Sequence, residues 1–586
     1  MTHFKTIPEM MSYVVGNFHN PRAFNEKIDD KWLHWSTEEI IRTARNLAIG
    51  LSESGLRKGE AVGLLAPSSP MWLIMDLAIV MAGGITVPVF SNISSKNLSY
   101  IVEDSGMQYI FIQGSEALAD VQEIKEKFDL IIQYDTNEVN WNMTHWKDIH
   151  EKGYQKSLAD AGAFNQITNK ITTTDIATYI YTSGSTGLPK GVELTHGNLM
   201  SQVNGAGEVF DVNASADLVL SCLPLAHIFE KMVVYFYISK GLSIYFADDI
   251  KKLGSLLQEV KPTLLTVVPR LLEKVKVSIQ EKAQNGGLIK KVISNFAFSR
   301  ASNKDPNSES GILDSMCNKL VYKKIKKALG GEIKTIISGG SALSKDLCTW
   351  YSNMGIPVFQ GYGMTECSPV IAVNCKKNNR IGSVGKLFPD VEVQISERGE
   401  ICVKGPGIMK GYHNNPDETH KTIDKGGWLS TGDKGMLDDD GYLFITGRIK
   451  EIFKTSNGKY VSPSQIENLL TEDITIEVSM IIGENRKFVS CLLFISPETI
   501  ENYIKKKGQD GLSPEEFVRS KNFISHIDSH IEKVNSELNH WEQIRKHNII
   551  YGIPTVDDGG LTPTLKIRRH ILNERYEKII EEMYEE

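Results

Sequence analysis

Strand and helix signals alternate through most of the first 340 residues, and this alternation is the feature that most limits the fold. Ser36–Glu39 is typical of a capping box that opens a helix ending near Gly55, and a strand is expected at Ala61–Ala66. Further strand segments follow, most of them separated by helical stretches: Tyr109–Ile112, Leu130–Tyr134, Ile176–Ile180, Leu218–Cys222, Ser243–Ala247, Leu264–Val268 and Lys334–Ser338. This alternation predicts an α/β protein with mainly parallel sheets that are covered by helices.

One apolar stretch, Met71–Phe90, carries a single charge, Asp76, and resembles a membrane span by composition. Gly83–Gly84 divides it, however. We therefore predict a buried helix up to Ala82, a glycine stop, and a buried strand at Ile85–Phe90. The whole stretch is interpreted as core.

Length and composition narrow the class of protein. A chain of 586 residues is too long for one hydrophobic core, so about two to four domains or subdomains are expected. The net charge of −7 gives no reason to expect nucleic acid as a partner. Seven scattered cysteines without a Cys-x-x-Cys pair, and an N-terminus without a secretory signal, predict a cytoplasmic protein with reduced thiols.

The segment Tyr181–Gly191 combines five hydroxyl side chains, three glycines and one lysine directly after a predicted strand. Glycines let backbone N–H groups turn toward an anion, hydroxyls add donors, and the lysine adds a full charge. The residues predicted to bind a polyphosphate are Thr182, Ser183, Gly184, Ser185, Thr186 and Lys190. The spacing is not that of a P-loop, and a flexible surface loop is the alternative. Behind the segment, Thr195 is expected to cap a helix.

Several polar clusters follow predicted strands: Thr182–Lys190, His227, Ser338–Ser341 and Gln360–Gly363. In open α/β sheets, ligands bind at the carboxyl ends of the strands. We therefore expect these clusters to meet at one site.

The pattern of predicted secondary structure changes after residue 390. Short strands with Gly and Asp turns at Val391–Ile395, Glu400–Val403 and Tyr442–Thr446 predict a small antiparallel subdomain. From Arg448 onward a compact α+β module is expected, with strands near Val478–Ile482 and Ser490–Ile495.

Tyr181–Gly191 resembles the signature of the adenylate-forming superfamily, which includes acyl-CoA synthetases, luciferases and peptide-synthetase adenylation domains. Companion motifs appear in order across nearly the whole chain: Leu223–Glu230, Gln360–Glu366, Ser430–Asp433, Gly447–Glu451 and Leu561–Lys566. The resemblance implies a large N-terminal domain, residues 1–447, and a small mobile C-terminal domain, residues 448–586. It also implies activation of a carboxylate by ATP with Mg²⁺, followed by transfer of the acyl group to coenzyme A.

The resemblance assigns roles at the reacting phosphates. Thr182–Thr186 and Lys190 would hold the β- and γ-phosphates, and Thr365 would donate to the α-phosphate. Glu366 would ligate Mg²⁺, which prefers oxygen ligands. Lys566 would stabilise charge on the carboxylate and α-phosphate, whereas without its motif it would be one more basic residue on a solvated helix.

The remaining roles concern the nucleoside, the acyl group and the hinge. Asp433 would accept hydrogen bonds from both ribose hydroxyls, and Arg448 would also contact the ribose. His227 would line the acyl site. The nucleotide-binding residues implied in addition are Gly339, Gly340, Tyr362, Gly363 and Lys454. Lys450 matches the hinge about which the C-terminal domain rotates between half-reactions, although some members have aspartate there.

Within the superfamily, Val268–Lys274 and Lys319–Gly331 resemble long-chain fatty acyl-CoA synthetases. A fatty acid is therefore the expected acyl substrate, together with ATP and coenzyme A. A fatty acyl-AMP ligase, another carboxylate-activating enzyme of the superfamily, and a non-catalytic nucleotide sensor remain as alternatives. A homodimer is a further expected assembly.

The insert at residues 276–327 contains eleven Lys or Arg against four Asp or Glu, and the apolar residues Leu288 to Phe296 repeat at helical spacing. This pattern predicts peripheral contact with the inner face of a membrane. The alternative is a solvated helix that packs its apolar stripe on its own domain.

Overall fold

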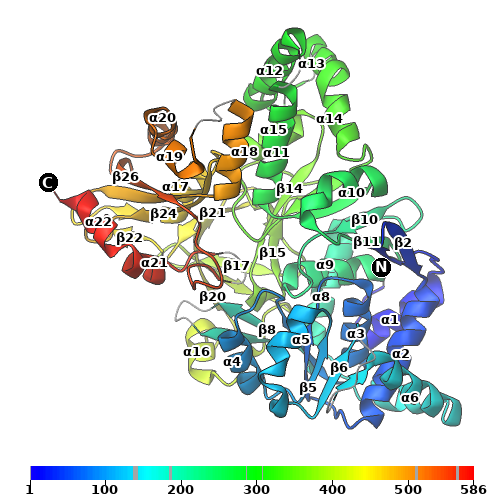
Figure 1. Ribbon diagram of the computed structural model, residues 1–586. Coiled ribbons are helices and arrows are strands. Elements are labelled where there is room, and N and C mark those ends of the chain that lie inside the picture. The colour runs from blue at the N-terminus through cyan, green and yellow to red at the C-terminus, as the bar shows by residue number, and fades with distance from the viewer. Residues whose placement is uncertain are drawn as a thin grey trace.

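The computed structural model describes residues 2–135, 143–183, 188–284, 287–306, 308–309, 311–449, 451–507, 512–562 and 566–585. Two helix-covered sheets are followed by a small antiparallel sheet and a C-terminal α+β unit (Figure 1), which confirms the predicted fold class. No helix within these ranges is long and apolar enough to cross a membrane.

The helices before the C-terminal unit are α1 Ile7–Asn17, α2 Thr37–Glu53, α3 Pro70–Met81, α4 Ser95–Ser105, α5 Ser115–Gln122, α6 Trp146–Ala159, α7 Ala163–Thr168, α8 His196–Val209, α9 Ile228–Ser239, α10 Leu253–Val260, α11 Pro269–Gln284, α12 Leu288–Asn303, α13 Ile312–Cys317, α14 Lys323–Ala328, α15 Lys345–Asn353 and α16 Pro416–Thr422.

The first sheet has the strand order β19-β9-β8-β4-β3-β5-β6-β7. Neighbours from β8 through β7 are parallel, as the alternation predicts. The strands are β3 Ala61–Leu65, β4 Ile85–Val89, β5 Tyr109–Ile112, β6 Leu130–Gln133, β7 Met143–His145, β8 Ile176–Ser183, β9 Pro189–Thr195 and β19 Gly411–Tyr412.

The secondary structure around the polyphosphate-binding candidate Tyr181–Gly191 differs from the expected order of strand, loop and helix. β8 runs on to Ser183, and β9 returns antiparallel to it before α8 begins. The Lys190-Gly191 pair interrupts the strand pattern of β9, so this strand could not be recognised from the sequence. The predicted capping of α8 is confirmed, because Thr195 and Asn198 form a capping box.

The second sheet has the order β16-β15-β14-β13-β12-β10-β11-β1-β2 and is parallel from β1 to β14. Its N-terminal hairpin was not expected, because the polar segment Asn25–His34 shows no clear apolar alternation. β1 nevertheless joins β11 with Phe24 opposite Ile244. The strands are β1 Phe24–Ile28, β2 Lys31–Trp35, β10 Leu218–Ser221, β11 Ser243–Phe246, β12 Leu264–Val267, β13 Thr335–Ser338, β14 Val358–Gly363, β15 Val370–Val373 and β16 Lys386–Leu387.

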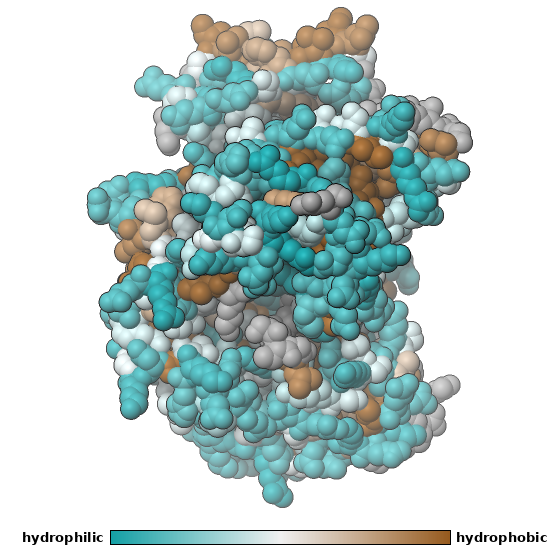
Figure 2. Space-filling model, turned by 90° about the vertical axis from the view of Figure 1, so that its left-hand side faces the viewer, coloured by the Kyte–Doolittle hydropathy of each residue, from teal (hydrophilic) through white to brown (hydrophobic). Residues whose placement is uncertain are grey.

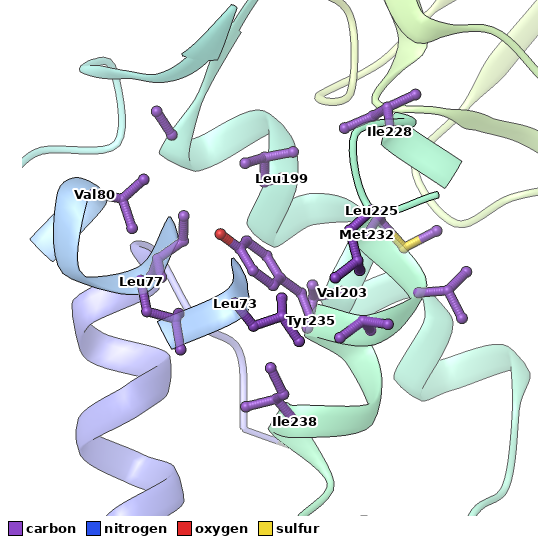
Figure 3. Packing of buried hydrophobic residues seen from close by; sticks show 14 of the residues in the cluster. Leu73, Leu77, Val80, Leu199, Val203, Leu225, Ile228, Met232, Tyr235 and Ile238 are labelled. Carbon is purple, nitrogen blue, oxygen red and sulfur yellow. The ribbon is translucent and has the colours of Figure 1, made fainter. Parts of the chain in front are cut away.

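One apolar cluster joins the two sheets through α3, α8 and α9. Every residue of α3 is buried, as predicted for the apolar stretch that contains it. Figure 3 shows Tyr235 of α9 between Leu73 and Leu77 of α3 and Val203 of α8. The ring of Tyr235 thereby fixes α9 against both neighbouring helices.

His196, the first residue of α8, is buried and accepts a hydrogen bond at Nδ1 from the N–H of Ile7 (3.3 Å). Burial lowers the pKa of His196 from 6.5 to about 4. The unfolded chain therefore binds a proton that the folded chain excludes, so stability falls as pH drops from 6.5 toward 4. We expect this residue to remove about 2 kcal/mol of unfolding free energy between pH 7 and pH 5. His196→Gln should flatten that dependence in urea unfolding, whereas the exposed control His570→Gln should not; equal pH dependence in both variants would contradict the assignment.

The segments after residue 390 also fold as predicted. A purely antiparallel sheet contains β17 Glu392–Ile395, β18 Glu400–Lys404, β20 Leu429–Leu437 and β21 Leu443–Arg448. The C-terminal unit contains β22 Phe453–Lys454, β23 Tyr460–Val461, β24 Ile476–Ile482, β25 Val489–Ile495, β26 Ile544–Tyr551, α17 Pro463–Leu470, α18 Pro497–Lys507, α19 Pro514–Val518, α20 Lys521–Glu537, α21 Arg569–Arg575 and α22 Glu577–Tyr584. It has an apolar core of its own around Phe523.

Candidate active site

A cavity of about 260 Å³ lies at the carboxyl ends of β8, β13 and β14, beside the N-terminus of α9. The polar clusters that the sequence placed after these strands therefore meet in one space. The predicted residues that line it are Thr182, His227, Gly339, Gly340, Tyr362, Gly363, Thr365, Glu366, Arg448 and Lys566. The last two come from the C-terminal side of the chain, so the cavity lies between the two predicted domains.

The other side of the same cavity is apolar. Its residues come chiefly from α8, α9 and β15 and are Phe90, Ile180, Ala206, Phe210, Met232, Val233, Phe236, Ile337, Val370, Val373 and Phe388. Gly205 allows Phe388 to pack there, since a Cβ at position 205 would lie 2.5 Å from the phenylalanine ring. A ligand in this cavity can thus have a charged end and an apolar end.

His227 caps the N-terminus of α9, where its Nδ1 accepts a hydrogen bond from the N–H of Phe229 (3.2 Å). Burial, and then the positive charge of Lys566, lowers the pKa of His227 to about 4. The ring is therefore neutral at physiological pH. Because Nδ1 accepts, the proton is assigned to Nε2, which can donate to a ligand in the cavity.

Asp433, Arg448 and Tyr362 form one hydrogen-bonded group. Asp433 and Arg448 lie opposite each other on β20 and β21, and Arg448 Nε donates to Asp433 Oδ1 (2.9 Å). The hydroxyl of Tyr362 donates to Asp433 Oδ2 (2.7 Å). Burial, and then the Asp433 carboxylate, raises the pKa of Tyr362 well above its usual range, so the phenol keeps its proton.

Glu366 lies in the short helical turn Thr365–Cys367 directly after β14. The Tyr412 hydroxyl donates to Glu366 Oε1 (2.8 Å), and burial raises the pKa of Tyr412. Lys190 Nζ lies 5.2 Å from the centroid of the Tyr412 ring and 2.6 Å from Glu418 Oε1. Lys190 is therefore connected to Glu366 through the tyrosine, although it does not line the cavity.

Two glycines keep the backbone close to the cavity. Gly340 has φ of +83°, a conformation that other residues rarely adopt. At Gly363, a Cβ would lie 1.9 Å from the carbonyl oxygen of Pro369. A side chain is therefore conformationally strained at Gly340 and sterically excluded at Gly363.

Lys566 enters the cavity from a loop near the C-terminus. Its N–H donates to Thr562 Oγ1 (3.0 Å), and the N–H of Thr562 donates back to the Lys566 carbonyl (2.8 Å). Surrounding protein atoms, and then the charge of Arg448, lower the pKa of Lys566, while Glu366 opposes this shift. Lys566 as a residue is nevertheless exposed.

Residues 15–413 match the model of the AMP-binding enzyme family, and residues 450–586 match that of the AMP-binding enzyme C-terminal domain. The chain belongs to the AMP-binding enzyme family. It is 30% identical to long-chain-fatty-acid–CoA ligase FadD15 of Mycobacterium tuberculosis over 569 residues, 96% of this chain and 94% of the relative. It is also 30% identical to long-chain-fatty-acid–CoA ligase ACSBG2 of Homo sapiens over 620 residues, 99% of this chain and 92% of the relative.

Solved structures share the fold. The adenylation domain of a carboxylate reductase from Mycobacterium chelonae superposes with a TM-score of 0.74 at 19% identity, covering 99% of this chain and 91% of that one. A fatty acyl CoA synthetase from Mycobacterium tuberculosis gives a TM-score of 0.59 at 20% identity, covering 98% and 99%. At these identities the likeness concerns the fold alone.

The site suits a magnesium ion that arrives with a nucleoside triphosphate. Within the described ranges no cluster of three or more His, Cys, Asp or Glu residues forms a metal centre. Glu366 offers one carboxylate to the cavity, next to the Thr365 hydroxyl. This fits Mg²⁺, which binds through one or two carboxylates and takes its other ligands from phosphates and water.

Some predicted site residues of this AMP-binding enzyme are not at the cavity. Lys454 is exposed on β22, with its ammonium 5.7 Å from the centroid of the Tyr460 ring. Gly184, Ser185, Thr186 and the hinge residue Lys450 lie outside the described residues, as does the side chain of Ser183.

Other residues at the site were not predicted from the sequence. Tyr412 and Glu418 lie in a Gly/Asn/Pro-containing stretch that resembles an ordinary turn, and Phe388 resembles any core aromatic residue. Tyr412 lies in β19, which has only the two residues Gly411 and Tyr412. A strand of this length is too short to be recognised from the sequence.

Proposed function

We propose that this AMP-binding enzyme is a long-chain fatty acid–CoA ligase that forms an acyl-adenylate and then an acyl-CoA. The observation that carries the proposal is a single cavity with an apolar wall on α8 and α9 and with Lys566, Glu366 and Thr365 at its polar end. A fatty acid placed there has its chain among apolar side chains and its carboxylate beside the cationic lysine. The names of the relatives support the long-chain class.

In the first half-reaction a carboxylate oxygen attacks the α-phosphorus of ATP. The bond from that phosphorus to the bridging oxygen breaks, and pyrophosphate leaves with the electron pair. Lys566 and Thr365 stabilise the negative charge on the phosphoryl oxygens, while Glu366 binds the Mg²⁺ that accompanies ATP. The protein contributes position and electrostatic stabilisation, which supply most of the catalysis in such transfers.

The nucleoside is assigned to the group around Asp433. The Asp433 carboxylate accepts from Arg448 and Tyr362, which line the cavity, and the ribose hydroxyls would donate to its remaining lone pairs. The adenine ring is assigned to the side of the cavity lined by Gly339, Gly340 and Tyr362. Thr182 and the loop that follows it, with Lys190, are assigned to the β- and γ-phosphates.

In the second half-reaction the thiol of coenzyme A attacks the acyl carbonyl, the carbonyl–phosphate bond breaks, and AMP leaves. We place the domain boundary between residues 447 and 448 and the hinge at Lys450, which agrees with family matches that end at residue 413 and resume at residue 450. Rotation about the hinge would break the Lys274–Glu477 ion pair (3.1 Å) and the bond from Arg270 to the Thr471 carbonyl (2.8 Å). Lys566 would leave the cavity and Lys454 would approach it.

Palmitate is expected to be used far better than acetate. Each buried methylene contributes about 0.8 kcal/mol, so a few methylenes on the apolar wall separate two acids by roughly a hundredfold in kcat/KM. The measurement is pyrophosphate release and thioester formation over a panel of fatty acids, with amino acids as controls. Greater efficiency with acetate or an amino acid would refute long-chain specificity. Adenylate without thioester would indicate a fatty acyl-AMP ligase, and no pyrophosphate at all would indicate a nucleotide sensor.

A cytoplasmic location, with peripheral contact at the inner membrane face through residues 276–327, is the second part of the proposal. The seven cysteines are all free thiols, which supports a reducing compartment. Assembly into a homodimer stays a prediction, and sedimentation velocity of the purified chain is its test.

A further inference from the structure

Two helices, α12 and α13, stand at one end of the molecule, at the top of Figure 1. α12 packs its small residues Ala297 and Ala301 inward, and Asn353 of α15 donates to the carbonyl of Ala301 (2.8 Å). Arg300 forms an ion pair with Asp314 (2.6 Å), which ties α12 to α13. The buried face of α12 is therefore already occupied by protein.

Four large apolar side chains of α12, Leu288, Ile289, Val292 and Phe296, lie on the opposite, open face, whereas Ile293 and Phe298 pack inward. Leu288 is 84% exposed and Ile289 is 78% exposed, and Ile312 of α13 is 82% exposed. We call the following residues the apolar tip: Leu288, Ile289, Val292, Phe296, Ile312, Leu313, Met316 and Leu320. Figure 2 shows apolar side chains gathered along the top of the molecule, where these two helices lie. A patch of this kind marks an interaction surface. Of the predicted stripe, Ile293 packs against its own domain, whereas Leu288, Ile289, Val292 and Phe296 are exposed.

Lysines flank the apolar tip on α12 and in the segment that follows α13. They are Lys290, Lys291, Lys319, Lys323 and Lys324, all of them exposed. Among the residues that the structure describes, none of these lysines forms an ion pair, unlike Arg300 and Lys304, which are both held by Asp314. A chain of net charge −7 thus presents a local cationic rim around an apolar surface.

We propose that the apolar tip and its flanking lysines dock onto the surface of an anionic lipid bilayer. The apolar side chains would enter the region between headgroups and acyl chains, while the ammonium groups contact lipid phosphates. A second copy of the chain fits less well. In a two-fold dimer the same patch meets itself, so the lysine rims of the two copies would repel each other.

The test is co-sedimentation of the full chain with vesicles, without ATP, coenzyme A or fatty acid, so that its result is independent of the proposed ligase activity. We expect binding to mixed phosphatidylcholine–phosphatidylglycerol vesicles, weakened by salt, and much weaker binding to phosphatidylcholine alone. Val292→Glu/Ile312→Glu should abolish binding. Lys290→Glu/Lys291→Glu should weaken it by at least ~25-fold, because each lysine near an anionic surface contributes roughly fivefold.

The matched control is Lys376→Glu/Lys377→Glu, which makes the same charge change in another exposed lysine pair and should bind like the wild type. Circular dichroism melting confirms that each variant is folded. The proposal is overturned if the wild type does not bind anionic vesicles. It is also overturned if Val292→Glu/Ile312→Glu or Lys290→Glu/Lys291→Glu binds them as tightly as the wild type. A vesicle-free dimer that Val292→Glu/Ile312→Glu dissociates would assign the surface to a second copy instead.

Discussion

Replacing Lys566 with alanine is expected to slow pyrophosphate release from ATP and fatty acid by roughly a hundredfold or more, because one charged donor to a developing oxyanion contributes on the order of 3 kcal/mol. The lysine lines the cavity together with Glu366 and Thr365, so its charge acts where the phosphoryl oxygens would lie. Attack of coenzyme A on supplied acyl-adenylate should be largely unaffected, since Lys566 is proposed to leave the cavity for that step.

Two comparisons separate this role from a general loss of structure. Lys578→Ala changes an exposed lysine of the same C-terminal unit and should retain both half-reactions. Lys450→Pro should show the reverse pattern to Lys566→Ala: adenylate forms but thioester does not, because proline fixes φ near −65° and obstructs the rotation. If Lys566→Ala and Lys450→Pro each lose both half-reactions equally, misfolding of the small domain is the better explanation and the rotation is wrong.

Asp76→Ala is expected to lower the unfolding free energy by about 3–5 kcal/mol, because it leaves a buried ammonium group without its partner. Asp76 Oδ1 lies 2.7 Å from Lys231 Nζ, and both side chains are completely buried. The Tyr235 hydroxyl donates to Asp76 Oδ2 (2.6 Å). Burial lowers the pKa of Lys231 and the Asp76 carboxylate opposes that shift, so Asp76 favours the charged form of the buried lysine.

The double variant Asp76→Leu/Lys231→Met is the decisive comparison. It removes both charges and should recover part of the lost stability in urea unfolding, since a buried pair is often replaceable by apolar residues. The rest stays lost because the buried Tyr235 hydroxyl no longer has its acceptor. Glu501→Ala, at an exposed carboxylate of α18, should change stability by less than about 0.5 kcal/mol. If the double variant is no more stable than Asp76→Ala, the loss comes from disturbed packing between α3 and α9 and not from an unpaired charge.

Features that depend on neighbouring residues in the chain were predictable from the sequence. The capping box at Ser36, the buried helix before Gly83 and the strand Tyr109–Ile112 are set by local hydrogen bonds, apolar periodicity and glycine conformation. The convergence of His227 with the residues after β13 and β14 was also predictable, because parallel strands bring their carboxyl ends to the same edge of a sheet.

Only the tertiary structure decided which distant segments meet. The pairing of β1 with β11, the return of β9 along β8, and the contact of Tyr412 with Glu366 join residues whose local sequences carry no signal for one another. The same holds for the apolar tip: periodicity placed the apolar residues from Leu288 to Phe296 on one helix face, but only the packing of α12 on α15 decided that most of this face is open. Local propensity determines the elements, whereas burial against partners far along the chain determines their neighbours, and a single sequence does not encode the second in any short window.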